Sequence, residues 1–176
     1  MKKINTLLIM LVLIILLNSC FIGDSRMLSH FMDNDQTHAN EIFDGLLNVI
    51  KTKDKNKLRS MFAKNAINLT SDFEAQIDAL FEYYSGVFVS YNDWAGPSVE
   101  YSREDDEEIK IMYSTYDVDT GKEIYRIAIR RVDIDTSNPD NVGIWSLYII
   151  KKEYNEDLDY AYRGDGKDTP GINIGI

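Results

Sequence analysis

The chain has 176 residues, with 29 acidic against 19 basic side chains and a formal net charge of −10 at neutral pH. A surface of this sign repels phosphate backbones, which argues against a nucleic-acid partner. There is a single cysteine, Cys20, so an intrachain disulfide and a zinc site made of several thiolates are both excluded. Stability must come from an ordinary apolar core, and the length suits one domain.

The N-terminus has the layout of a secretory signal peptide. Lys2 and Lys3 form a positive start, and an uninterrupted apolar run follows from Leu7 to Leu17. A membrane-spanning helix needs about 20 apolar residues, and this run is shorter, so it favours a cleaved signal over an uncleaved anchor. The next residues, Leu17-Asn18-Ser19-Cys20, resemble a bacterial lipobox, in which a leucine and a small residue precede the cysteine.

The lipobox resemblance implies cleavage before Cys20 and a diacylglyceryl group on its thiol. Two acyl chains give stable anchoring where one chain gives only marginal binding. We therefore expect a signal peptide at residues 1–19, a lipidated polar tether at 20–36 and an attached domain at 37–154. The domain would lie on the outer face of the cytoplasmic membrane, with residues 155–176 as a mostly irregular tail.

Apolar residues at three- and four-residue spacing predict three helices in the first half of the domain. The first covers about 35–52. The second covers about 55–64 with Asp54 as its N-cap, and 65–70 is expected to break it. Ser71 and Glu74 have the spacing of a capping box, which predicts the start of the third helix, and Gly86 is placed to end it. The predicted stripe of this third helix is Phe73, Ile77, Leu80, Phe81 and Tyr84.

After Gly86 the apolar period changes to two, which predicts strands. The expected strands lie at 87–91, 99–101 and 109–114, from Glu123 onward, and at 144–150. The expected connections are a loop at 92–97 and a hairpin turn at 117–121. Residues 144–150 are apolar at both parities, which predicts an interior strand covered on both faces.

The strand that begins at Glu123 changes phase after Ile129. The next apolar residues are Val132 and Ile134, one position out of step. A one-residue slip indicates a β-bulge, which bends a sheet, and we place it at Arg130–Arg131. The bulge is expected to turn Val132 and Ile134 toward the helices.

Three helices followed by a curved antiparallel sheet predict an α+β fold, with the helices on the concave face. The element order resembles the nuclear-transport-factor-2-like, or cystatin-like, cone. The chain is also similar to a Gram-positive lipoprotein family catalogued as domain of unknown function 5104. That resemblance implies the fold and the lipid anchor, and brings no catalytic residues. It rests on Ala39–Phe43, Phe73–Phe81, Tyr116–Val118, Asn138–Leu147 and Pro170–Ile172.

Few residues have the pattern of a chemical site. A cone pocket can hold acid–base groups, as ketosteroid isomerases do with tyrosine and aspartate, and Tyr113, Tyr125 and Asp133 are the candidates here. Arg131 and Asp133, with Trp145 on the partner strand, are candidate contacts at the rim opened by the bulge. Core packing is the competing explanation for each aromatic residue.

Metal and cofactor sites are not predicted. The acidic run 104–108 is interpreted as a solvated hairpin tip rather than a cation site. Asp117–Gly121 begins like a calcium loop but has Ala128 where the closing acid belongs. The only histidines are His30, in the tether, and His38, interpreted as a surface residue. No glycine-rich phosphate loop is present.

These observations favour a non-catalytic binding module on the membrane surface. Its partner would be a protein or an envelope ligand; one version is an immunity protein that blocks a toxin, and a basic partner would suit the acidic domain. The alternative is a small-molecule enzyme with its site in the cone pocket, which needs a cavity with convergent polar groups. A third hypothesis is a lipoprotein that only spaces envelope components.

Overall fold

The computed structural model describes residues 25–154 and 167–175, with side chains from residue 34 onward. The chain divides into two compact units, Met1–Asn34 and Asp35–Ile176, and the description below concerns the second. Lys2, Lys3, the apolar run and Cys20 lie outside the described residues. Within the described part of the chain, no helix is both long enough and apolar enough to cross a membrane.

The first described helix, α2 (Ser25–Thr52), begins well before the expected position near Asp35. The prediction of an irregular tether up to residue 36 is therefore wrong from Ser25 onward. Ser25 and Asn34 favour irregular structure, but Arg26, Met27 and Leu28 between them are good helix formers. The helix continues through them without interruption.

Two short helices follow where one was expected. Asp54 caps α3 (Lys55–Met61) as predicted, and its carboxylate accepts a hydrogen bond of 3.0 Å from the Lys57 N–H. The stretch expected to be a break is instead a helix, α4 (Lys64–Leu69). Between the two helices the backbone is extended, and the Ala63 N–H donates to the carbonyl of Ile144 at 2.9 Å. A tertiary contact to the sheet thus separates the helices.

The last helix, α5 (Phe73–Tyr83), has a different cap from the predicted one. Asp72 is the N-cap, and its carboxylate accepts from the Ala75 N–H at 3.0 Å. The predicted N-cap, Ser71, is therefore wrong by one residue, and Ser71 and Glu74 do not form a capping box. Glu74 instead pairs with Arg59 of α3 at 2.7 Å. The predicted apolar stripe is confirmed, with all five residues at most 9% exposed.

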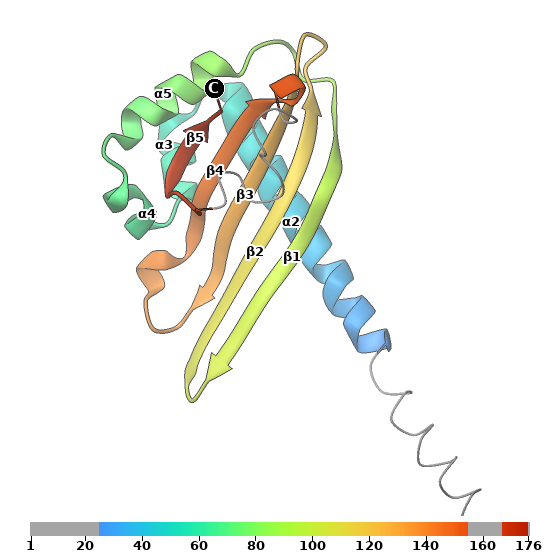
Figure 1. Cartoon of the computed structure of the whole chain (residues 1–176), viewed down its shortest axis with the longest axis vertical. Coiled ribbons are helices and arrows are strands. Elements are labelled where there is room, and N and C mark those ends of the chain that lie inside the picture. Colours follow the sequence, from blue (N-terminus) through green and yellow to red (C-terminus); the bar gives the residue numbers. More distant parts are fainter. Residues whose placement is uncertain (1–24, 155–166, 176) are drawn as a thin grey trace, which may run out of the picture. The chain divides into compact units, whose positions relative to one another are not determined.

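Five strands form one open sheet in the order β1-β2-β3-β4-β5. The first four pair antiparallel and β5 pairs parallel to β4, so the predicted α+β class is confirmed (Figure 1). Short 3₁₀ helices, η1 (Pro139–Asn141) and η2 (Lys152–Tyr154), flank β4. The strands are β1 (Ser90–Glu104), β2 (Glu107–Asp119), β3 (Ile124–Asp135), β4 (Gly143–Lys151) and β5 (Gly171–Ile174).

Two strand predictions are corrected. The expected strands at 87–91 and 99–101 and the loop between them are a single strand, β1, which continues through two register shifts on either side of Ala95. Val87 and Val89 precede this strand and are 79% and 60% exposed. The tail, expected to be irregular, supplies β5 along the free edge of β4. A short strand of this kind depends on its neighbour and has little signal of its own.

The core lies between the helices and one face of the sheet. In Figure 1, α2 runs behind the strands and α3–α5 group beside β5. β4 is buried at both parities, which confirms that it is an interior strand. The largest fully buried core side chains include Phe43, Leu46, Ile50, Leu58, Ile77, Leu80, Tyr116, Tyr125, Ile127, Ile144 and Leu147.

The sheet has a register shift between Arg130 and Arg131 in its β3–β4 pairing, as predicted, but the extra residue is on β4. Arg130 is opposite Ser146 and Arg131 is opposite Ile144, so Trp145 has no partner. In the β2–β3 pairing the shift comes later, with Asp133 as the extra residue.

The expected change of phase within β3 therefore comes later than predicted, at Asp133. Ile134 lies opposite Lys110 on the face that meets α2, as expected, but the prediction that Val132 also turns toward the helices is wrong. Arg131 stays in phase with Ile129 on the face that meets the helices, and Val132 lies on the opposite face. The bulge in β4 could not be predicted, because the strand is apolar at both odd and even positions and a one-residue slip leaves that pattern unchanged. It lets Ile144 and Leu147, three residues apart, both enter the core.

Candidate functional site

The five residues predicted as pocket or rim contacts lie at three separate places. Tyr125 is in the core at one end of β3. Tyr113 and Trp145 come together around Arg130 on the other face of the sheet. Arg131 and Asp133 face α2. The structure therefore does not unite Tyr113, Tyr125 and Asp133 in one site.

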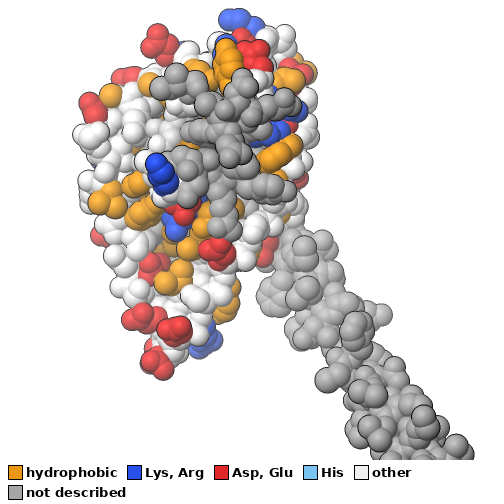
Figure 2. Space-filling view, in the orientation of Figure 1, with side chains coloured by type: hydrophobic (Ala, Val, Ile, Leu, Met, Phe, Trp, Pro, Cys, Tyr) orange, Lys and Arg blue, Asp and Glu red, His pale blue; other side chains and the backbone are white. Residues whose placement is uncertain are grey.

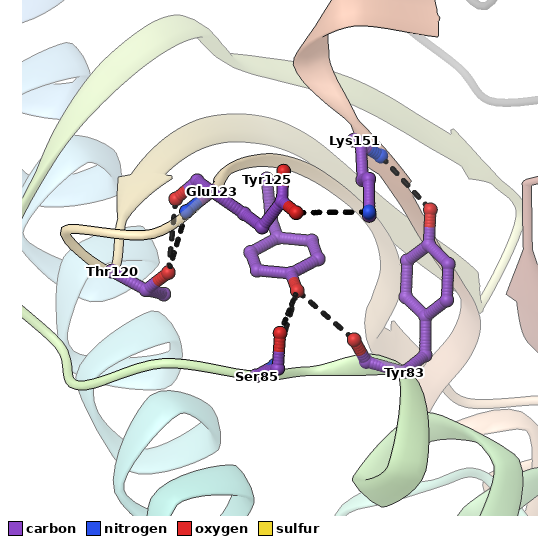
Figure 3. Close-up of polar contacts among 6 residues, drawn as sticks. All are labelled: Tyr83, Ser85, Thr120, Glu123, Tyr125 and Lys151. Atoms are coloured by element: carbon purple, nitrogen blue, oxygen red, sulfur yellow. Dashed lines mark hydrogen bonds and ion pairs between the residues drawn. The ribbon is translucent and has the colours of Figure 1, made fainter.

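The hydroxyl of Tyr125 ties the end of α5 to the sheet. It accepts from the Ser85 N–H and donates to the Tyr83 carbonyl, both at 3.0 Å (Figure 3). The Tyr83 hydroxyl in turn accepts from the Lys151 N–H at 3.0 Å. Burial raises the pKa of the Tyr83 hydroxyl, which keeps it protonated. These hydroxyl groups are occupied by backbone partners, so their evident role is structural.

Arg130 holds the C-terminal segment against the sheet. Its guanidinium lies 5.4 Å from the ring centre of Trp145 and 5.9 Å from that of Tyr113. It also pairs with Asp168 at 3.4 Å. The indole N–H of Trp145 donates to the carbonyl of Asp168 at 3.1 Å. The β4 bulge places Trp145 here, where it fastens the segment that leads into β5.

Arg131 and Asp133 belong to a polar cluster that also includes His38. Asp133 Oδ1 accepts from Arg131 Nε at 2.8 Å and lies 3.3 Å from His38 Nε2. His38 was predicted to be a surface residue, and its side chain is 42% exposed; its contact with Asp133 was not foreseen. Beside it, Lys110 pairs with Asp35 at 2.6 Å. We call Asp35, His38, Lys110, Arg131 and Asp133 the α2 rim.

The α2 rim is incompletely satisfied. The Asp133 side chain is only 9% exposed, and its second oxygen, Oδ2, is buried without a hydrogen-bond partner. A buried polar atom of this kind is uncommon in native proteins and calls for an explanation. The His38 side chain is 42% exposed. The imidazole of His38 is therefore the part of this cluster that an approaching group can contact.

Sequence reasoning missed the most buried charges of the domain. Asp117 was assigned to the hairpin turn, but it lies in β2 directly opposite Arg126 of β3. Arg126 binds both oxygens of Asp117, at 2.8 and 3.1 Å, and Lys152 binds one of them at 2.8 Å. The Trp94 ring centre lies 3.6 Å from the Arg126 guanidinium. Residues equally far from a hairpin turn face each other, so counting outward from Thr120–Glu123 would have paired them.

The pKa of Asp117 reflects two opposing effects. Burial alone would raise the pKa of this carboxyl, but the hydrogen bonds and charges of Arg126 and Lys152 outweigh it and hold the pKa below its ordinary value. The side chains of Asp117 and Arg126 are 3% and 6% exposed. A pair that is this buried and this fully bonded has no capacity left for a ligand.

Aromatic side chains fill the space between α2 and the sheet, where the enzyme alternative places its pocket. Phe43 of α2 stacks on Tyr116 of β2 with ring centres 3.8 Å apart, and both meet Tyr91 edge-on. Asn40 accepts from the Tyr116 hydroxyl at 3.1 Å, and Asp44 accepts from that of Tyr91 at 2.9 Å. Within the described part of the chain, no group of three or more histidine, cysteine or acidic residues could hold a metal ion.

The chain belongs to the family described as domain of unknown function (DUF5104), which matches residues 45–152. This match covers most of the compact unit and confirms the family resemblance seen in the sequence. A comparison with curated proteins gives no match. The membrane anchor, the Gram-positive origin and the nuclear-transport-factor-2-like classification remain predictions.

Proposed function

We propose that this chain is a lipoprotein anchored through Cys20 to the outer face of the cytoplasmic membrane, and that its α+β domain is a non-catalytic module that binds a basic protein. The anchor is supported by the lipobox-like residues 17–20 after an apolar run. The binding role is carried by one structural observation, the exposed acidic end of the β1–β2 hairpin. Toxin immunity is one specific form of this function.

The β1–β2 hairpin extends past its neighbour in the sheet. β3 ends at Asp135 opposite Ile109, so the hairpin beyond Ile109 has no strand beside it on that side. Glu104, Asp105, Asp106 and Glu107 at its end are all exposed. Figure 2 shows acidic side chains gathered at this end. Charge of one sign on a projecting element attracts a partner of the opposite sign and speeds encounter.

The α2 rim lies at the base of the same hairpin. Lys110 of the rim follows shortly after Glu107 on β2 and is opposite Ile134. A partner drawn by the hairpin would therefore meet the half-exposed His38, which lies 3.3 Å from Asp133 Oδ1. The hairpin supplies attraction at a distance, and the rim supplies hydrogen bonds at contact.

Lipid anchoring is tested by the change Cys20→Ala. The variant should lose incorporation of labelled fatty acid and keep its N-terminal apolar run, because both processing steps require the thiol. Intact mass and metabolic labelling of the full chain measure these outcomes. Unchanged labelling in the variant would refute the anchor.

Partner binding is tested by charge reversal at the hairpin. Full-length protein is cross-linked in its own membranes, and the partner captured by wild type is quantified for each variant. The double variant Asp105→Lys/Asp106→Lys should lose most of this partner. The matched control Glu82→Lys/Glu153→Lys changes the net charge equally at exposed positions elsewhere and should retain it. Equal recovery from both variants would remove the assignment to the hairpin.

A further inference from the structure

A groove of about 600 Å³ lies where both long helices of the domain end. One wall is the C-terminal end of α2, from Ile50 to Lys53. The other is formed by the end of α5 and the segment 85–88 that leads into β1. This volume is within the range of small-molecule sites. The groove shares no residue with the α2 rim or the acidic hairpin.

The lining of the groove is mainly apolar. Ile50, Phe81 and Tyr84 are 2%, 6% and 9% exposed, and Phe88 is half-buried beside them. Val87 at the margin is 79% exposed, with no cover from the described chain. An apolar molecule lying in the groove would remove the exposed surface of Val87 and Phe88 from water, which favours binding.

Tyr84 adds a polar group without a partner. Its hydroxyl is buried and makes no hydrogen bond, whereas the neighbouring hydroxyl of Tyr125 is fully bonded. Burial raises the pKa of the Tyr84 hydroxyl, so it stays protonated and remains a donor. An unused buried donor in the lining of a groove suits a ligand with an acceptor oxygen.

Two lysines stand at this groove without acidic partners. Lys51 Nζ lies 4.7 Å from the ring centre of Phe88, and Lys53 has a left-handed backbone with φ of 54°. Glycine is the usual residue in that conformation after a helix. Among the described residues, no carboxylate pairs with either lysine, although the chain has 29 acids. Glu82 is the acid among the lining residues.

We propose that this groove binds a single-chain amphiphile with an anionic headgroup. The apolar chain lies along Ile50, Phe81 and Phe88, and the anion lies between Lys51 and Lys53. A neutral or cationic headgroup would leave both ammonium groups without a counter-charge. The chemistry is shared by fatty carboxylates and by lipids with a phosphate headgroup, and the choice between them is made by experiment.

The test is calorimetry on the full chain in lipid nanodiscs, with protein-free nanodiscs as the blank. The probes are octanoate, octyl phosphate, octyltrimethylammonium and acetate. At least one of the two chain-bearing anions should bind saturably, and the tighter one identifies the headgroup. The cation and acetate should not saturate over the same range. Equal binding of octanoate and octyltrimethylammonium, or saturation by neither octyl anion, would overturn the proposal.

Substitutions locate the binding. Lys53→Gln should weaken the tighter octyl anion by up to about fivefold, the upper value for an exposed ion pair, and Glu82→Gln should strengthen it. Tyr84→Phe should weaken it without lowering the thermal midpoint, because the hydroxyl has no internal partner to lose. Lys122→Gln is the matched control, since this exposed lysine lies outside the groove, and it should change nothing. Wild-type affinity in both Lys53→Gln and Tyr84→Phe would also overturn the proposal.

Discussion

Two aspartate–arginine pairs of the sheet differ in how fully their hydrogen-bonding groups are used. Asp117 and Arg126 face each other across β2 and β3, bond through two nitrogens and are closed over by Lys152 and Trp94. In the α2 rim, by contrast, Asp133 and Arg131 lie on one strand and share one oxygen with His38, while Oδ2 has no partner. In the first pair, the hydrogen bonds within the pair offset the free-energy cost of removing its charges from water. The second pair keeps an unused hydrogen-bond acceptor, so it is the better candidate for a role in binding.

The largest expected effect comes from breaking the complete pair. Arg126→Met leaves Asp117 buried with one cation in place of two, and the loss of one partner of a buried ion pair costs about 3–5 kcal/mol. Urea unfolding measures this loss. The matched change Arg131→Met in the α2 rim should cost less, about 1 kcal/mol, because the Arg131 side chain is 22% exposed and water can take over part of its bond to Asp133. Equal losses in the two variants would show that the two pairs do not differ.

The next effect is a loss of stability in acid. The folded pKa of Asp117 lies below its ordinary value of 3.8. The pair's stabilisation is therefore fully present above that pH and is lost as the pH falls through the folded pKa. The double variant Asp117→Leu/Arg126→Met should lose this part of the acid response, measured as the urea midpoint between pH 5 and pH 2. If the double variant lost stability in acid to the same extent as wild type, the loss would be due to other carboxylates.

The same comparison shows what the sequence could predict. Periodicity located the buried stripe of α5 and the core face of β3, because these depend on local spacing alone. The Asp117–Arg126 pair follows from hairpin register once the turn is centred correctly. The rim does not, because His38 and Asp133 are 95 positions apart and only the packing of α2 on the sheet brings them together. The β4 bulge had no signal, since both faces of that strand are apolar.

Arg131→Ala is expected to destabilise the domain less than Arg126→Met does, and to reduce partner binding. Its guanidinium is 22% exposed, and water can take over much of its bond to Asp133. In the cross-linking assay, capture of the partner should fall several-fold, because Arg131 no longer holds the Asp133 carboxylate in place beside His38. Trp145→Ala is the contrast: it should mainly destabilise the domain by releasing the contact to Asp168. Wild-type capture by Arg131→Ala would move the interface away from the rim.

The smallest effect on stability is expected from His38→Gln. This variant separates a role of the rim in partner binding from a role in folding stability. Glutamine retains an N–H donor that reaches toward Asp133, and the side chain it replaces is 42% exposed. The free energy of unfolding should therefore change by about 0.5 kcal/mol or less. Capture should fall nonetheless if the exposed imidazole contacts the partner, because that surface changes shape and chemistry. The comparison is made at fixed pH with Thr52→Ser as the control, an exposed change at the other end of α2. If His38→Gln altered stability as much as Arg131→Met while capture stayed constant, the rim would be a structural pair like Asp117–Arg126, and the contrast between the two pairs would not extend to function.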